Sequence, residues 1–347
     1  MQTQTELEIR KNWIYSEPPL VSVVCVTYNQ ESYIEDAIRG FLIQETDFPF
    51  EIIIHDDAST DGTTAIVKEY AERYPNLIRP VLQQENQFSQ PGKNVILIAV
   101  SYTRGQYIAL CEGDDYWMDS KKLHKQMATM QQYPECRLSF HPALKVDMQN
   151  HKKTIMDRHA KHNKVFNVGD IIKKSGGYCP TASLIFKKEV FNSIPNWFYQ
   201  VTIGDYFLQI LGALKGGALY IDEVMSVYRV NAQESWSVRK INPIFLMNQY
   251  IRILDSLDSA DRFMNYICRR QFNIAKRITL WRMSQNTNFS AEKRRETFRL
   301  IKNKLGVKEK ILWLLVYQYP CFSRMLGRVR GKTKVLQCFL FNYKVAK

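Results

Sequence analysis

Residues 106–117 read Gln-Tyr-Ile-Ala-Leu-Cys-Glu-Gly-Asp-Asp-Tyr-Trp, an apolar run that breaks abruptly into carboxylates. The apolar part, residues 107–111, predicts a buried strand of a parallel sheet. Ligands of open α/β sheets bind just outside the carboxyl ends of such strands. Three carboxylates within four residues repel one another unless a cation or a donor-rich ligand lies among them. The stretch therefore predicts a ligand site at a sheet edge, with a solvated acidic turn before the next helix as the alternative.

The residues before this stretch alternate between strand and helix patterns. Apolar, β-branched runs predict strands at 20–27, 50–55 and 77–82. Apolar residues at helical spacing follow them and predict helices over about 34–42, 61–74 and 92–103. This alternation is typical of an α/β domain with a doubly wound, mostly parallel sheet and a ligand crevice along one edge.

The remainder of the chain predicts shorter strands and then helices. Strands are expected at 137–140, 144–148, 181–186, 218–221 and 225–230. Residues 149–164 are polar and hold three of the six histidines, at spacings that fit no standard zinc signature, so we expect a loop near the acceptor site. Helices are expected at 123–133, 207–214, 243–258, 260–284, 290–305 and 307–318. These patterns predict an N-terminal extension (1–19), an α/β domain (20–240) and a helical C-terminal region (241–347).

The net charge of +14 is unevenly distributed. Residues 261–347 hold 21 Lys and Arg against 4 Asp and Glu, whereas the preceding 260 residues hold 27 against 30. A near-neutral body with a basic tail favours a polyanionic partner, either a membrane surface or a nucleic acid. Aromatic residues such as Trp313 and Tyr317 lie among the basic ones and favour an anionic membrane surface. A solvated helical face or a homodimer contact is the alternative, and no recognised motif supports a nucleic-acid partner.

Seven cysteines form no C-x-x-C pair, and several lie within apolar strand-like runs. This pattern is typical of reduced, buried thiols in a cytosolic protein. The first residues contain no apolar segment of a signal peptide, and the longest apolar run, 311–317, is far below the roughly 20 residues that span a bilayer. We therefore expect the protein in the cytoplasm, free or peripherally bound to the inner face of the cell membrane.

The loops after the predicted strands carry groups that suit a nucleotide. They hold an aromatic ring, Tyr28, two carboxylates, Asp56 and Asp57, and the acidic corner Glu112-Gly113-Asp114-Asp115. Neither G-x-G-x-x-G nor G-x-x-x-x-G-K-[ST] is present, which disfavours dinucleotide and P-loop sites. A stacking ring, carboxylates that accept base N–H groups and a corner for a hard divalent ion favour a nucleotide diphosphate with a bridging cation.

Four motifs in this order resemble family 2 glycosyltransferases of GT-A type. They are Val-Thr-Tyr-Asn-Gln (26–30), Asp-Asp-Ala-Ser-Thr-Asp-Gly-Thr (56–63), the acidic corner and Gly204-Asp205. The resemblance covers about residues 20–236, roughly two-thirds of the chain. It implies an inverting enzyme that uses a nucleotide-sugar donor and a divalent metal, Mn²⁺ or Mg²⁺.

The resemblance also implies roles for particular residues. Tyr28 would pack on the base, Asp57 would bind the base edge, and Asp114 and Asp115 would serve the ribose and the metal. The implied nucleotide contacts are Thr27, Tyr28, Asn29, Asp56, Asp57, Lys93, Asn94, Glu112 and Asp114.

Four positions depart from the family pattern. Val26 stands where a proline is common in the first motif. Glu112 replaces the first aspartate of D-x-D, so its longer arm is expected to meet ribose or water rather than the metal. Lys93 stands where the family often has arginine. Asn231 stands at the histidine position of Y-R-x-H and can still offer an oxygen to the metal or diphosphate.

Asp205 opens an amphipathic helix, and its local sequence is explained by a capping role at the helix N-terminus. The resemblance instead implies that it is the catalytic base, which takes a proton from the acceptor hydroxyl. The acceptor or sugar pocket is expected to include Thr181, Ser183, Asn231 and Trp236. We expect a UDP-sugar donor and a glycan or lipid-linked acceptor of surface polysaccharide biosynthesis. A nucleotidyltransferase on a related sheet is the rival enzyme, although it would normally have a glycine-rich phosphate loop.

Overall fold

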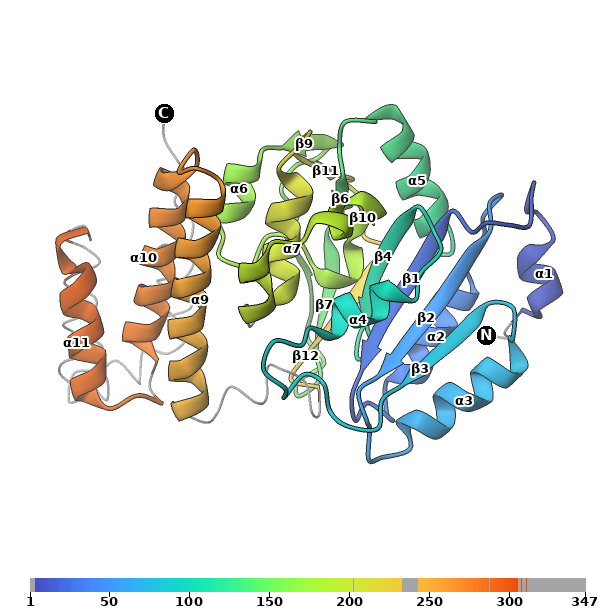
Figure 1. The fold of residues 1–347 in the computed structure, drawn as a ribbon, viewed down its shortest axis with the longest axis horizontal. Coiled ribbons are helices and arrows are strands. Elements are labelled where there is room, and N and C mark those ends of the chain that lie inside the picture. The colour runs from blue at the N-terminus through green and yellow to red at the C-terminus, as the bar shows by residue number, and fades with distance from the viewer. Residues whose placement is uncertain are drawn as a thin grey trace.

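The computed structural model describes residues 4–201, 203–232, 243–286 and 288–304, together with Val307 and Lys310. Figure 1 shows a large twisted sheet with helices packed on it, and a group of long helices at the end of the molecule away from the N-terminus. This arrangement confirms the α/β class with a helical C-terminal region. The expected division near residue 240 lies outside the described residues, and the domain boundaries stay predictions.

The large sheet has eight strands in the order β3-β2-β1-β4-β10-β6-β11-β9. The first four strands along the chain pair in parallel, and each begins and ends within one residue of its predicted bounds. They are β1 (Val21–Thr27), β2 (Phe50–Asp56), β3 (Ile78–Leu82) and β4 (Tyr107–Glu112). Beyond β4 the sheet is mixed and contains β10 (Ile185–Lys187), β6 (Leu138–Phe140), β11 (Ala218–Tyr220) and β9 (Lys164–Phe166).

The parallel strands are apolar on both sides because helices cover both faces of the sheet. In β1, Val24 packs in one cluster with residues of α4 and of α7 (Gly204–Ala213). Val23 and Cys25 pack in the other cluster with residues of α2 and α3. The helices of this half are α1 (Glu6–Arg10), α2 (Ile34–Leu42), α3 (Thr63–Arg73), α4 (Val95–Ser101) and α5 (Lys122–Gln132). The five described cysteines are free and buried, as expected.

A second sheet of four strands lies in the order β5-β12-β7-β8. It consists of β5 (Tyr116–Trp117), β12 (Ser226–Val230), β7 (Ala143–Asp147) and β8 (Lys153–Met156). The prediction of a loop over 149–164 is wrong, because a tight turn at His151 returns the chain as β8 against β7 and β9 begins at Lys164. A polar sequence is compatible with such an edge strand, since most of β8 faces solvent.

The prediction of one strand over 181–186 is also wrong. Pro180 introduces a single 3₁₀ turn, η1 (Thr181–Ser183), and the strand β10 starts only at Ile185. The shift matters for the site because η1, rather than a sheet strand, presents Thr181.

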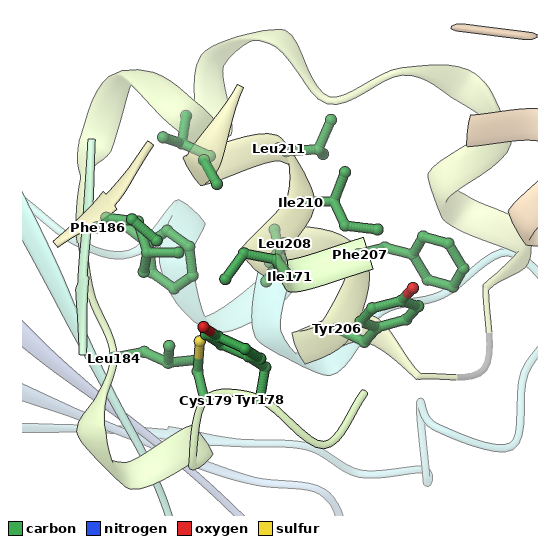
Figure 2. Close-up of a cluster of buried hydrophobic side chains, with 14 of the residues drawn as sticks. Ile171, Tyr178, Cys179, Leu184, Phe186, Tyr206, Phe207, Leu208, Ile210 and Leu211 are labelled. Carbon is green, nitrogen blue, oxygen red and sulfur yellow. The ribbon is translucent and has the colours of Figure 1, made fainter. Parts of the chain in front are cut away.

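The remaining helices follow β9 along the chain. They are α6 (Val168–Lys173), η2 (Lys188–Ser193), η3 (Asn196–Gln200), α7 (Gly204–Ala213), α9 (Pro243–Phe263), α10 (Arg269–Gln285), α11 (Ala291–Ile301) and η4 (Lys302–Lys304). Figure 2 shows side chains of α7 gathered with Ile171 of α6 and Phe186 of β10. None of the described helices is long and apolar enough to cross a membrane. The helix predicted at 307–318 falls almost entirely outside the described residues.

Candidate functional site

The carboxyl ends of the parallel strands meet at one edge of the large sheet. Thr27 lies beside Asp56, Val26 beside Glu112, and Asp56 beside Leu82 in the strand register. The polar loops that follow these strands therefore converge, as the sequence predicted.

The loops after β1 and β2 are joined by hydrogen bonds into one unit. The backbone N–H of Asn29 donates to Ser59 Oγ at 2.9 Å, and the N–H of Thr60 donates to Asn29 Oδ1 at 2.8 Å. Asn29 has a φ of 52°, a left-handed conformation that asparagine tolerates better than most residues. These bonds fix the chain on either side of Tyr28, which is half-buried at the start of the loop.

The two aspartates after β2 have different surroundings. Asp56 is buried and accepts hydrogen bonds from the hydroxyls of Ser59 and Thr64, so it stabilises its own turn. Asp57 accepts from the backbone N–H groups of Gln87, at 2.7 Å, and Phe88, at 3.0 Å. Asp57 thus holds the long loop before α4 beside the loops of β1 and β2.

The segment before α4 also reaches the start of α7. Asn94 caps α4 by accepting from the N–H of Leu97 at 3.1 Å. A Cβ atom at Gly204 would lie 3.0 Å from Asn94 Nδ2, so the two segments are in close contact. Lys93 is exposed one residue earlier, at the outer side of this contact.

The acidic corner packs tightly against the first loop. A Cβ atom on Gly113 would lie 2.4 Å from Gln30 Oε1 and 2.7 Å from Thr27 Oγ1, so only glycine fits there. Asp115 is buried, and its Oδ1 accepts from the backbone N–H of Arg229 at 2.8 Å. Its Oδ2 is buried without a hydrogen-bond partner.

Arg229 of β12 is a site residue that the sequence did not single out. Its guanidinium donates to the carbonyl of Asp114 at 3.0 Å and to the carboxylate of Asp36 in α2. It also lies 4.5 Å from the centre of the Tyr116 ring. The sequence signal for this residue was Tyr228-Arg229, the first two residues of the Y-R-x-H pattern. Nothing in the local sequence showed that the arginine contacts the acidic corner.

The carboxylates of this edge form one electrostatic cluster. Burial, with added repulsion from Asp114 and Asp205, raises the pKa of Glu112 to about 8. Burial likewise raises the pKa values of Asp114, Asp115 and Asp205. Tyr228 of β12 also lies near these carboxylates. Its phenol pKa is raised first by burial and then by the charges of all four. Asp205 and the acidic corner, about 90 residues apart in sequence, are therefore neighbours.

Asp205 lies in the first turn of α7 and accepts a hydrogen bond from Thr181 Oγ1 at 3.2 Å. Its backbone surroundings offset part of the effect of burial on its pKa. The expected helix-end position is thus confirmed, and the same carboxylate is close enough to Glu112 to raise its pKa.

The other predicted pocket residues are less uniformly placed. Ser183 is buried and donates to Pro180 O at 2.6 Å, so its hydroxyl is used within η1. Asn231 has a φ of 60°, and its Nδ2 donates to Asp147 Oδ1 at 3.1 Å, at the end of β7. Trp236 lies outside the described residues.

The donor set of the acidic corner fits a hard divalent cation. Asp115 has a buried carboxylate oxygen without a partner and a raised pKa. A positive charge nearby would interact with that oxygen and lower the pKa. Among the described residues no group of three or more His, Cys, Asp and Glu forms a complete metal site. Such ions commonly use one or two carboxylates and complete their shell with substrate phosphates and water.

The chain is similar in sequence to known glycosyltransferases. Residues 22–193 match the model of glycosyl transferase family 2. The chain is 37% identical over 217 residues to an uncharacterized protein of Mycobacterium bovis, a match that covers 62% of this chain and 60% of the relative. It is 37% identical over 129 residues to a Bacillus subtilis protein named putative teichuronic acid biosynthesis glycosyltransferase TuaG, covering 37% of this chain and 47% of the relative. The chain therefore spans about 60% or less of the length of these relatives.

Solved structures share the fold at low sequence identity. S. aureus TarS 1–349 in complex with UDP-GlcNAc aligns with a TM-score of 0.58 at 19% identity, covering 85% of this chain and 78% of that one. The mannosyltransferase PcManGT of Pyrobaculum calidifontis, in complex with GDP-Man and Mn²⁺, aligns with a TM-score of 0.52 at 15% identity, covering 93% and 89%. Both likenesses confirm the expected GT-A fold.

We predict that Glu112→Gln raises the free energy of unfolding at pH 8 and above by about 1 kcal/mol or more. The folded-state pKa of Glu112 is raised from 4.5 to about 8, so ionisation destabilises the folded protein progressively as the pH rises between these values. The difference from wild type should therefore vanish near pH 4.5. Urea unfolding at pH 5, 6.5 and 8 measures it, with Glu69→Gln, at an exposed position on α3, as the control. If Glu112→Gln and wild type had the same free energy of unfolding at pH 8, the proposed electrostatic interaction among these carboxylates would be wrong.

Proposed function

Because residues 22–193 belong to glycosyl transferase family 2, we propose that this protein is an inverting glycosyltransferase that uses a nucleoside-diphosphate sugar. The observation that carries the proposal is the proximity of Asp205 to the acidic corner, where its charge helps to raise the pKa of Glu112. One carboxylate is thus available for proton transfer beside others suited to a cation and a diphosphate.

The donor is a UDP-sugar bound along the converging loops. Tyr28 stacks on the base, Asp57 accepts its N–H groups, and Glu112 meets the ribose. Further contacts come from Thr27, Asn29, Asp56, Lys93, Asn94 and Asp114. Support for this donor comes from the fold shared with TarS, which was solved with UDP-GlcNAc. Because Asp56 and Asp57 already accept hydrogen bonds from the protein, their contacts with the nucleotide use their remaining lone pairs.

Asp114 and Asp115 hold the metal, Mn²⁺ or Mg²⁺, and the PcManGT complex with Mn²⁺ provides a precedent on the same fold. When bound, such an ion neutralises the charge that develops on the leaving diphosphate. Arg229 keeps the corner in place by holding the carbonyl of Asp114 and, through its backbone N–H, one oxygen of Asp115.

Asp205 is the general base of the transfer. Its carboxylate takes the proton of the acceptor hydroxyl, the hydroxyl oxygen bonds to the anomeric carbon, and the bond from that carbon to the diphosphate oxygen breaks. Attack from the face opposite the leaving group inverts the anomeric centre. Burial raises the pKa of Asp205 toward neutral pH, and a pKa nearer the working pH favours general-base catalysis.

The acceptor is a glycan or lipid-linked hydroxyl of surface polysaccharide biosynthesis. Thr181, Ser183, Asn231 and Trp236 are proposed around it, with Ser183 acting through the turn that it stabilises. The named role of TuaG in teichuronic acid biosynthesis supports this class of acceptor.

A lipid-linked acceptor requires the enzyme to work at the inner face of the membrane. Arg295 and Arg299 of α11 and its C-cap Lys302 are exposed at positions spaced four and three residues apart, a spacing that places them on one helix face. Leu300 beside them is 66% exposed. We assign this basic face to an anionic membrane surface; a homodimer contact is the alternative.

Asp114→Asn should abolish binding of UDP in the presence of Mn²⁺, because a neutral amide does not replace the carboxylate that faces the cation. Isothermal titration calorimetry with UDP and MnCl₂ is the measurement. Asp47→Asn is the control, since Asp47 is exposed and precedes β2 at the opposite edge of the sheet. Undiminished affinity in a folded Asp114→Asn protein would remove the metal and diphosphate part of the proposal.

Asp205→Asn should keep UDP and Mn²⁺ affinity while lowering turnover by about 10² or more, the usual scale for a general base. The amide oxygen can still accept from Thr181, so the variant separates a helix-capping role from a catalytic one. Sugar transfer is followed with the donor that a thermal-shift panel of nucleotide sugars selects. Turnover near the wild-type rate would mean that Asp205 only caps α7.

The triple variant Arg295→Gln/Arg299→Gln/Lys302→Gln should weaken co-sedimentation with phosphatidylglycerol liposomes about 100-fold at low salt, at about 1 kcal/mol for each cation. Wild-type binding should fall steeply as salt is added. Lys11→Gln/Lys68→Gln/Lys121→Gln removes three exposed cations from the N-terminal extension and the α/β domain and is the control. A wild-type protein that stays in the supernatant at low salt would refute membrane docking and leave the nucleotide site untouched.

A further inference from the structure

Lys122, the first residue of α5, is completely buried although it carries an amine. Its Nζ donates to Gln126 Oε1 at 2.7 Å and lies 4.0 Å from the centre of the Trp117 ring. Burial lowers the pKa of Lys122 to about 7. Burying an amine costs folding stability. We therefore expect a role of Lys122 toward the two side chains that it contacts, Gln126 and Trp117.

Both contacts of Lys122 lead to the turn η1. Trp117 Nε1 donates to Ala182 O at 2.8 Å, and Gln126 Nε2 donates to Ser183 O at 2.9 Å. The Ser183 carbonyl only accepts, and the Lys122 amine can donate in either protonation state, so these two neighbours fix which way the Gln126 amide points. Lys122 therefore orients two side chains that hold the backbone of η1.

The turn is held on its other side as well, and it carries Thr181. Gln209 of α7 donates from Nε2 to Cys179 O at 3.2 Å. Figure 2 shows Cys179 and Leu184, which flank the turn, within the hydrophobic cluster beside α7. Within the part of the chain that the structure describes, Thr181 is the residue of η1 whose side chain donates a hydrogen bond to Asp205, at 3.2 Å.

We propose that Lys122 is a positioning residue for Asp205. It holds Trp117 and Gln126, which hold η1, and η1 places the Thr181 hydroxyl against Asp205. The inference rests on the proposed function only in giving Asp205 a catalytic role. A donor on one carboxylate oxygen keeps the buried group ionised and leaves the other oxygen for the acceptor proton.

Lys122 and Asp205 interact with different titratable groups. His141, after β6, and Cys111, in β4, interact with Lys122. Glu112, Cys179 and Tyr228 interact with Asp205. The two sets share no member, but Cys111 also interacts with Glu112, so the double variant below is needed to separate this electrostatic route from the hydrogen bonds of η1.

The test is the titration midpoint of Asp205, measured by ¹³C NMR on the full chain with labelled aspartate carboxyls and assigned by the signal that Asp205→Asn removes. Thr181→Val removes the donor and should raise the midpoint by about one pH unit, and Thr181→Ser should restore it. Lys122→Met should raise it in the same direction. Lys121→Met, at the exposed neighbouring position, should leave it unchanged.

The double variant Lys122→Met/Thr181→Val decides whether Lys122 acts through Thr181. Its midpoint should equal that of Thr181→Val alone. The proposal is overturned if Lys122→Met leaves the midpoint at the wild-type value, or if it adds its full effect in the Thr181→Val background. If Lys122→Met does not fold, Gln126→Glu replaces it, because glutamate still accepts from Lys122 but cannot donate to Ser183 O.

This measurement needs neither donor nor acceptor, so the two proposals fail separately. Full transferase activity in Asp205→Asn would remove the proposed base and leave the coupling measurable. An inactive Asp205→Asn together with an unmoved midpoint in Lys122→Met would overturn only the positioning role.

Discussion

Repulsion among carboxylates at the end of β4 is the constraint to which the rest of the site is fitted. Glu112, Asp114 and Asp115 leave the strand together, and α7 brings Asp205 to the same place. Burial raises all four pKa values, and repulsion from neighbouring carboxylates adds to the effect at Glu112 and Asp115, so the folded protein without a cation is electrostatically strained there. In the proposed function a divalent ion would relieve that strain by supplying charge of the opposite sign, and a diphosphate would complete the oxygen ligands of the ion.

The scaffold compensates part of this strain through the second sheet. β12 pairs with β5 and β7, and its Arg229 extends toward the acidic corner and α2. The contact ties the loop after β4 to a strand more than 100 residues later in the chain. Similarly, Thr181 on η1 links Asp205 to the buried contacts of Lys122. The proposed site thus combines residues from both sheets and from η1.

The sequence by itself determined the parallel half of the sheet. Apolar runs bounded by polar loops place β1 to β4 within one residue, because strands covered on both faces leave a continuous hydrophobic pattern. The same rule places Tyr28, Asp57 and the acidic corner at one edge. Asp205 was found only through the family resemblance, since its local sequence is equally that of a helix cap.

Tertiary structure decided what the local pattern could not encode. The polar stretch that became β8 has no hydrophobic period, and its strand exists because β7 offers backbone partners. Pro180 turned an expected strand into η1, and that turn gained its role only from side chains of α5, β5 and α7. Arg229 and Lys122 are likewise defined by contacts distant in sequence. Local sequence fixes where a strand ends, but long-range burial and charge fix which groups meet there.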